Sequence, residues 1–196
     1  MFHIYLPKKA RKRKMPNTLK ISYALLDRDG VLIEDKGRIH KIEDLHILPN
    51  VIEGLRVISD LGIKFIVVTN QAGIAKGYFD HDDYDKFNSE LIKRLFDEGI
   101  TIEATYMCPH HPNHTGDCLC RKPNTGMAEQ ATKDFSISPQ DTILVGDKDS
   151  DIEMGKRWGC RTFRIVNDKY EEKINADFRV KDLLEVANVI KQKLFA

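Results

Sequence analysis

The chain has 196 residues, and its 31 Lys and Arg nearly balance its 30 Asp and Glu. It therefore has no strong net charge that would favour nucleic acid or an acidic membrane as a partner. The length suits one α/β domain. There is no apolar run of the roughly 18 residues that predict a membrane-spanning helix, and the N-terminus lacks the apolar region of a signal peptide. We expect a cytoplasmic monomer without nucleic-acid or membrane partners.

A basic segment precedes the body of the chain. Residues 8–14 read Lys-Lys-Ala-Arg-Lys-Arg-Lys, which suits either a nucleic-acid or targeting arm or, more simply, a solvated tail. We predict that residues 1–18 form a disordered extension and that residues 19–196 form a single domain.

Apolar runs typical of strands alternate with helical patterns, which favours a parallel sheet with helices on both faces. The apolar runs at residues 65–68 and 143–145 suit strands that are buried on both faces. We expect strands at residues 23–26, 64–69, 104–108, 142–145, 161–165 and 178–180. We expect helices at residues 51–61, 82–98, 126–134, 150–158 and 183–193. The predicted fold is a Rossmann-like, three-layer α/β fold, and no insertion is long enough to form a large cap domain.

Two carboxylates follow the first expected strand. Asp27 and Asp29 stand two residues apart, directly before Gly30. An isolated Asp-x-Asp-Gly is often a simple turn. At the carboxyl end of a buried parallel strand, however, the pair could hold Mg²⁺, and one carboxylate could attack a phosphoryl group.

Polar residues follow three other expected strands. Thr69, Asn70 and Gln71 could donate hydrogen bonds to phosphate oxygens. Arg121 and Lys122 could both bind a phosphoryl group. Arginine offers a planar guanidinium with several donors, and lysine offers a compact ammonium charge. After the expected strand at residues 142–145, Asp147 could complete a metal site, and Ser150 could cap the next helix. Asp149 and Asp151 suit an acidic helix N-terminus, which the helix dipole favours.

The segment at residues 108–120 contains three of the four cysteines. Cys108, His110, Cys118 and Cys120 supply a complete Cys₃His set for tetrahedral, structural Zn²⁺. His111 and His114 are rival imidazoles. Two alternatives remain for this segment. The cysteines could be free surface thiols, or the segment could be a zinc module that binds nucleic acid. A zinc ion here would order the loop directly before Arg121 and Lys122.

Asp-x-Asp-Gly, then Thr, then Lys, then Gly-Asp-x-x-x-Asp, each at an expected strand end, resembles the haloacid dehalogenase superfamily of phosphohydrolases. The resemblance covers residues 22–166. It implies that Asp27 is the nucleophile and that Asp29 protonates the leaving group and then activates water. It further implies that Thr69 and Lys122 hold the phosphoryl oxygens. Mg²⁺ would be bound by Asp27, the backbone carbonyl of Asp29, and Asp147.

The zinc loop followed by Arg-Lys-Pro looks like the branch that contains the heptose bisphosphate and histidinol-phosphate phosphatases. The pattern of residues 27–44 is similar to that of the heptose enzymes. Lys36 and Arg38 stand where that family usually has His and Tyr, and their charges would suit a second phosphate, although surface-facing side chains would explain them equally. The resemblance implies substrate contacts from Asp35, Lys36, Gly37, Arg38, Thr69, Asn70, Gln71, Ala72, Arg121 and Lys122.

The implied reaction is Mg²⁺-dependent hydrolysis of the C7 phosphate of D-glycero-D-manno-heptose 1,7-bisphosphate, in nucleotide-heptose synthesis for surface polysaccharide. The anomer of this small sugar phosphate stays open. The alternatives are histidinol phosphate as substrate or, in a different class, a non-catalytic binding module built on the zinc loop.

Overall fold

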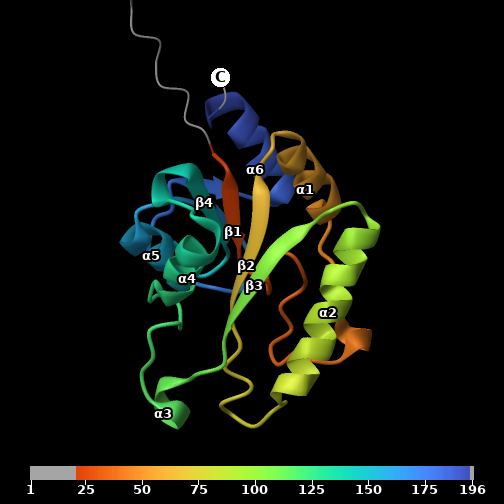
Figure 1. Cartoon of the computed structure of the whole chain (residues 1–196), viewed down its shortest axis with the longest axis vertical. Coiled ribbons are helices and arrows are strands. Elements are labelled where there is room, and N and C mark those ends of the chain that lie inside the picture. Colours follow the sequence, from red (N-terminus) through yellow and green to blue (C-terminus); the bar gives the residue numbers. More distant parts are fainter. Residues whose placement is uncertain (1–20, 195–196) are drawn as a thin grey trace, which may run out of the picture.

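A parallel sheet with helices on both faces forms the body of the protein (Figure 1). The computed structural model describes residues 21–194, so the predictions for residues 1–18 lie outside the described part. All five pairings in the sheet are parallel, in the order β3-β2-β1-β4-β5-β6. The strands are β1 (Tyr23–Leu26), β2 (Lys64–Asn70), β3 (Ile102–Cys108), β4 (Thr142–Gly146), β5 (Arg161–Ile165) and β6 (Phe178–Val180). The predicted three-layer fold is confirmed.

The helices connect the strands and cover the two faces of the sheet. They are α1 (Val51–Asp60), α2 (His81–Asp97), α3 (Pro112–Thr115), α4 (Gly126–Phe135), α5 (Asp149–Trp158) and α6 (Leu183–Val189). The short helical turns are η1 (Ile42–Asp44), η2 (Pro139–Asp141) and η3 (Ile190–Leu194). In Figure 1, α1, α2 and α6 lie on one side of the sheet, and α4 and α5 lie on the other. In the described part of the chain, residues 27–50 and 71–80 contain no helix longer than η1, so no large cap covers the sheet.

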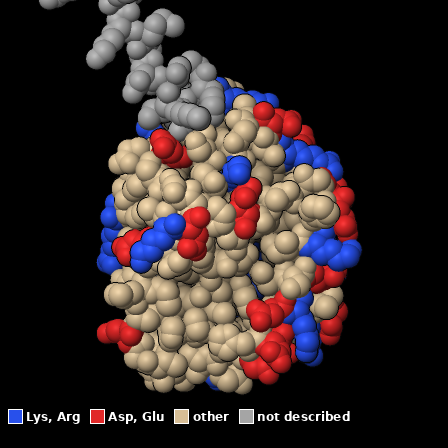
Figure 2. Space-filling view, viewed as in Figure 1, with Lys and Arg blue, Asp and Glu red and all other residues tan. Residues whose placement is uncertain are grey.

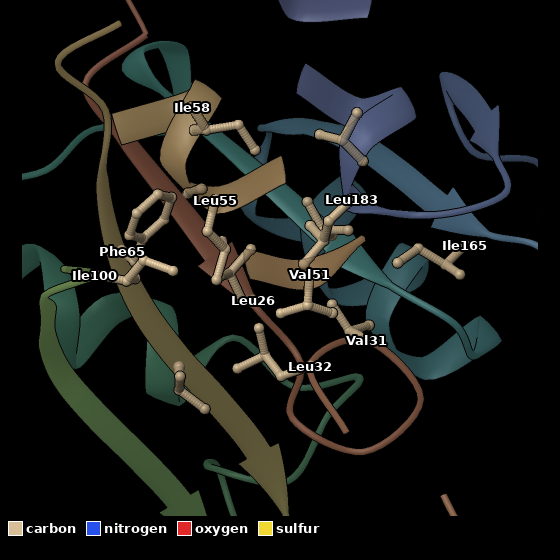
Figure 3. Close-up of a cluster of buried hydrophobic side chains, with 14 of the residues drawn as sticks. Leu26, Val31, Leu32, Val51, Leu55, Ile58, Phe65, Ile100, Ile165 and Leu183 are labelled. Carbon is tan, nitrogen blue, oxygen red and sulfur yellow. The ribbon is translucent and has the colours of Figure 1, made fainter. Parts of the chain in front are cut away.

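Alternation along β1 joins the sheet to a hydrophobic core on each face. Leu26 belongs to the core beneath α1, α2 and α6, whereas Leu25 belongs to the core beneath α4 and α5. Figure 3 shows Leu55 and Ile58 of α1 pointing toward Leu26 and Phe65 of the sheet. Truncating one such leucine to alanine costs about 3 kcal/mol, so these layers hold the strand ends in fixed positions.

A close approach between α1 and α6 depends on Gly54. A Cβ atom at this position would lie 2.5 Å from the carbonyl carbon of Leu183. Only glycine therefore lets the two helices pack at this distance.

Three local predictions were wrong. Ser150 does not cap α5, because the helix begins at Asp149 and Asp151 Oδ2 accepts the N–H of Lys148 at 3.0 Å. The C-terminal helix changes to a π turn at Ile190. The loop after β3 contains the short helix α3, where no helix was predicted.

Figure 2 shows acidic and basic side chains mixed on the visible face, without a large patch of one sign. Among the helices within residues 21–194, none combines the length and the hydropathy needed to cross a bilayer.

Candidate active site and metal centres

The two predicted carboxylates lie at the middle of the sheet's carboxyl edge. β1 is flanked by β2 and β4, and the N–H of Asp27 donates to the carbonyl of Val145 at 2.9 Å. Asp27 is buried, with 4% of its surface exposed, whereas Asp29 lies in the wall of a pocket that opens to solvent. One carboxylate is therefore enclosed by the protein, and the other faces the pocket.

Lys122 binds the Asp27 carboxylate from the opposite side of the site. Its Nζ lies 2.8 Å from Asp27 Oδ1 and 2.6 Å from Asp151 Oδ1, and it donates to the carbonyl of Val68 at 2.8 Å. Burial disfavours the ammonium ion, but the carboxylates of Asp151 and Asp27 outweigh burial and raise the pKa of Lys122 above its usual value. Lys122 is therefore a fixed cation within reach of any group that reacts at Asp27.

Three buried carboxylates form a cluster that can hold a cation. Asp27, Asp147 and Asp151 offer oxygen atoms that all lie within 4.8 Å of one another. Asp147 Oδ1 is buried and accepts no hydrogen bond from the described residues. Burial raises the pKa of Asp147 to about 7, and the neighbouring Asp27 adds to the effect while Lys148 opposes it. Oxygen ligands with this charge suit Mg²⁺. A bound ion would offset the repulsion among the three carboxylates and would give Asp147 Oδ1 a partner.

Gln71 links the pocket-facing carboxylate to β2. Its Nε2 donates to Asp29 Oδ2 at 2.7 Å and to Thr69 Oγ1 at 2.8 Å. The Asp29 carboxylate thus points toward Gln71, and only the backbone carbonyl of Asp29 is a predicted Mg²⁺ ligand. Thr69 and Gln71 are nearly fully buried, so both side chains hold fixed orientations.

Asn70 and Arg121 stabilise the main chain around Lys122. Asn70 Oδ1 accepts the Lys122 N–H at 3.0 Å, and Asn70 Nδ2 donates to the Lys122 carbonyl at 3.1 Å. The Arg121 guanidinium donates to the carbonyl of His110 at 3.0 Å. These contacts connect the end of β2 to the segment after the cysteines.

A pocket of about 310 Å³ opens beside Asp29. Two of the cations in its wall, Arg38 and Lys76, have no carboxylate partner within residues 21–194. The Arg38 guanidinium lies over the Tyr78 ring, 3.8 Å from its centroid. The predicted substrate residues Asp35, Gly37, Arg38, Asn70, Gln71 and Ala72 all line this pocket.

Asp35 and Lys36 are neighbours in sequence but differ in their surroundings. Asp35 is bound by Lys148 Nζ at 2.9 Å, Lys169 Nζ at 3.1 Å and the Tyr170 hydroxyl at 2.6 Å. Lys36 instead pairs with Glu34 at 2.9 Å and lines an adjacent cavity of about 550 Å³, next to Asp147. Of the two extra cations noted in the sequence, Arg38 alone lines the pocket beside Asp29.

The predicted zinc ligands come together in the loop after β3. The three thiols of Cys108, Cys118 and Cys120 lie 3.1 to 3.6 Å apart. His110 Nδ1 lies 3.7 Å from Cys108 Sγ and 3.3 Å from Cys120 Sγ. Such spacing suits four ligands around one tetrahedral ion with Zn–S bonds of about 2.3 Å. The rival imidazoles are elsewhere, since His111 caps α3 and packs against His114.

Several residues of this site could not be assigned from the sequence. Asp151 was explained by the helix dipole, yet its carboxylate binds Lys122; its place four residues after Asp147 was the available signal. Lys76, Lys148 and Tyr170 line the pocket without having been predicted, although Lys148 lies within the Gly-Asp-x-x-x-Asp segment. Lys169 lies outside the pocket wall and pairs with Asp35.

Comparisons with known proteins agree on one family. The HAD-hydrolase-like family model matches residues 119–186. The chain is 45% identical, over 145 residues, to D-glycero-alpha-D-manno-heptose-1,7-bisphosphate 7-phosphatase of Photorhabdus laumondii, covering 71% of this chain and 79% of that protein. It is 40% identical, over 134 residues, to the corresponding beta-heptose enzyme of Haemophilus influenzae, covering 66% and 73%.

A solved structure has the same fold. The D,D-heptose 1,7-bisphosphate phosphatase of B. bronchiseptica, complexed with magnesium and phosphate, superposes with a TM-score of 0.79 at 24% identity. The match covers 88% of this chain and 99% of that one.

Proposed function

The chain belongs to the HAD-like heptose-1,7-bisphosphate 7-phosphatase family of phosphoric monoester hydrolases, and we propose that it removes the C7 phosphate of D-glycero-D-manno-heptose 1,7-bisphosphate through an aspartyl-phosphate on Asp27. One observation carries the proposal: a buried lysine ammonium lies 2.8 Å from the carboxylate of Asp27. Asp27 stands two residues before Asp29, which lines a pocket together with cations that have no acidic partner among residues 21–194. A binding module without catalysis would have no need for this buried charge arrangement.

In the first step, an Asp27 carboxylate oxygen attacks phosphorus, and the bond between phosphorus and the C7 oxygen breaks. The proton of Asp29 passes to the departing oxygen, which leaves as an alcohol. Lys122 and Thr69 bind the phosphoryl oxygens and stabilise their charge in the transition state.

In the second step, water attacks the phosphorus of the aspartyl-phosphate and loses its proton to the Asp29 carboxylate. The bond between phosphorus and Asp27 breaks, inorganic phosphate leaves, and both carboxyl groups return to their starting states. Asp27, the backbone carbonyl of Asp29, and Asp147 would hold Mg²⁺. The bound ion would neutralise the phosphoryl oxygens beside the nucleophile.

Arg38 and Lys76 support a substrate with a second anionic group. Both cations line the pocket beside Asp29 and have no acidic partner in the described chain. The C1 phosphate of the heptose bisphosphate would supply that partner, whereas the amine of histidinol phosphate would be repelled. The contacts that the family resemblance assigns to Asp35, Lys36 and Ala72 are part of the proposal.

Zn²⁺ has a structural role in this proposal. Four protein ligands leave no open coordination position, and the loop at residues 108–120 leads directly into Arg121 and Lys122. We assign the reaction to nucleotide-heptose synthesis for surface polysaccharide. We place it in the cytoplasm, because the clustered cysteines suit a metal better than a disulfide framework. We also propose that the enzyme is a monomer.

Two measurements test the function. Purified protein should hydrolyse α- or β-heptose 1,7-bisphosphate with a kcat/KM at least about tenfold above that for histidinol phosphate, a difference of about 1.4 kcal/mol in transition-state binding. Asp27→Asn should abolish turnover. A preference for histidinol phosphate would overturn the substrate, and unchanged turnover in Asp27→Asn would overturn the covalent mechanism.

A further inference from the structure

Arg28, between the two catalytic carboxylates, binds its own neighbour. Its Nη2 lies 3.0 Å from both carboxylate oxygens of Asp29, and its Nε lies 3.2 Å from Oδ1. The Arg28 side chain is 1% exposed, and that of Asp29 is 17% exposed. Among residues 21–194, Asp29 is the only acidic partner of this buried guanidinium.

The turn after β1 makes this contact between sequence neighbours possible. The carbonyl of Arg28 accepts the N–H groups of Leu32 and Ile33 at 3.0 and 3.1 Å, and Gly30 has a φ of +89°. This tight turn brings the two side chains to the same side of the backbone. The ion pair is therefore part of the motif that contains the nucleophile.

Two aromatic rings of α2 enclose the guanidinium. Its central carbon lies 4.9 Å from the Phe87 ring centroid and 5.6 Å from that of Tyr84. Cations within about 6 Å of an aromatic face are attracted to it, most strongly where water is excluded. The rings thus fix the plane of the guanidinium and, through it, the direction of its donors.

We propose that Arg28 is a positioning residue that holds the Asp29 carboxyl group in place for both proton transfers. Gln71 supplies the second contact at 2.7 Å from Oδ2, so the carboxyl group is held by Arg28 on one side and Gln71 on the other. This inference rests on the acid–base role of Asp29 in the proposed function. Arg28 also lines the pocket, but its guanidinium donors are directed at Asp29, so we assign it to positioning and not to substrate binding.

The geometry requires arginine and not merely a cation. A planar guanidinium can stack between rings and direct several donors at one carboxylate, whereas a lysine ammonium is a point charge without a plane. Arg28→Lys should therefore retain the charge but fail to restore the orientation of Asp29.

A leaving-group experiment separates positioning from general stability. On the heptose bisphosphate, Arg28→Met should lower kcat about 100-fold, as expected when acid–base catalysis is lost, with KM close to that of wild type. With 4-nitrophenyl phosphate, whose leaving group departs without a proton, the first step should remain fast. A burst of nitrophenolate equal to the enzyme concentration should then precede slow hydrolysis of the aspartyl-phosphate.

Three further variants complete the experiment. Asp29→Asn sets the behaviour expected when acid–base catalysis is absent, and Arg28→Lys should resemble Arg28→Met. Arg94→Met is the matched control, because Arg94 of α2 pairs with Glu90 and the carbonyl of Leu45, away from Asp29. This control should show wild-type kcat and no burst.

The outcomes distinguish the two levels of the proposal. Wild-type kcat in Arg28→Met or Arg28→Lys, with Asp29→Asn impaired, would overturn the positioning role alone. Full turnover in Asp29→Asn would overturn the acid–base mechanism as well. If Arg28→Met does not fold, Phe87→Leu removes one ring while retaining every charge. This variant should show the same burst with a smaller loss of kcat. Absence of the burst in Phe87→Leu would overturn the proposal.

Discussion

The ammonium nitrogen of Lys122 lies 2.6 Å from Asp151 Oδ1, and the two side chains are 2% and 1% exposed. Asp151 belongs to the first turn of α5, whereas Lys122 follows the cysteine-rich loop. The ion pair therefore joins the two sides of the site across Asp27, the proposed nucleophile. Replacing both partners of such a buried pair by apolar groups often changes the free energy of unfolding little. Removing only one partner is costly, because it leaves the other charge buried and unpaired.

Asp151→Asn tests this pair. The variant should lower the free energy of unfolding by about 3 kcal/mol, because the buried Lys122 charge loses one of its two carboxylates. It should also reduce kcat, since Lys122 would shift toward Asp27. Urea unfolding and steady-state kinetics measure the two effects. Glu153→Gln on the same helix removes an exposed ion pair with Arg157 and should change stability by less than about 1 kcal/mol; an equal loss in both variants would contradict the argument.

Gly30→Ala should weaken Mg²⁺ binding. A Cβ at residue 30 would lie 2.2 Å from Asp147 Oδ2, at a backbone φ of +89°. The Asp147 carboxylate would have to move, and disturbing a metal ligand costs about 10- to 100-fold in affinity or activity. The measurement is the Mg²⁺ concentration for half-maximal activity. Gly62→Ala is the control, because its φ of +79° imposes similar strain while its Cβ would meet open space; matching shifts would refute the steric explanation.

Chelation should divide the cysteines into two classes. Removing the proposed zinc ion should expose Cys108, Cys118 and Cys120 to iodoacetamide, because their thiols lie within 3.6 Å of one another in a loop with little apolar content. Cys160 should stay unmodified until the protein unfolds, since burial raises the pKa of its thiol to about 12. Mass spectrometry with and without chelator counts the modified residues. Modification of Cys160 in the folded protein would show that its burial is wrong.

Asp35→Asn should change the acid stability of the protein. Burial disfavours the ionised form of Asp35, but Lys148, Tyr170 and the Gly37 N–H outweigh it and hold the pKa of this carboxyl well below its usual value. Its ionisation therefore stabilises the folded state fully above the ordinary aspartate pKa of about 3.9, and this stabilisation declines as the pH falls below that value. The Tm of wild type should exceed that of Asp35→Asn at neutral pH, and the difference should shrink in acid. A constant difference would contradict the assigned ion pairs.

The sheet could be predicted because its signals are local. Apolar runs identify β1, β2 and β4, and polar residues directly after a strand lie at its carboxyl end in any parallel sheet. Asp27, Thr69 and Asp147 were found in this way.

Side-chain direction could not be predicted. Lys36 turns to Glu34, two residues away, while Arg38 turns to Tyr78, and no pattern distinguishes these outcomes in advance. Tyr170 reaches Asp35 across 135 positions of sequence. Such long-range contacts depend on how loops pack above the sheet, which periodicity does not encode.

The two hydrogen bonds from Asn70 to the main chain of Lys122 have a consequence for zinc starvation. They attach the active-site lysine to β2 independently of the thiols. Protein that has lost the proposed zinc ion should therefore lose order first between His110 and Cys120, while Lys122 stays beside Asp27. If the proposed function holds, cells short of zinc would then retain a slower phosphatase with weakened substrate discrimination, and not an inactive one.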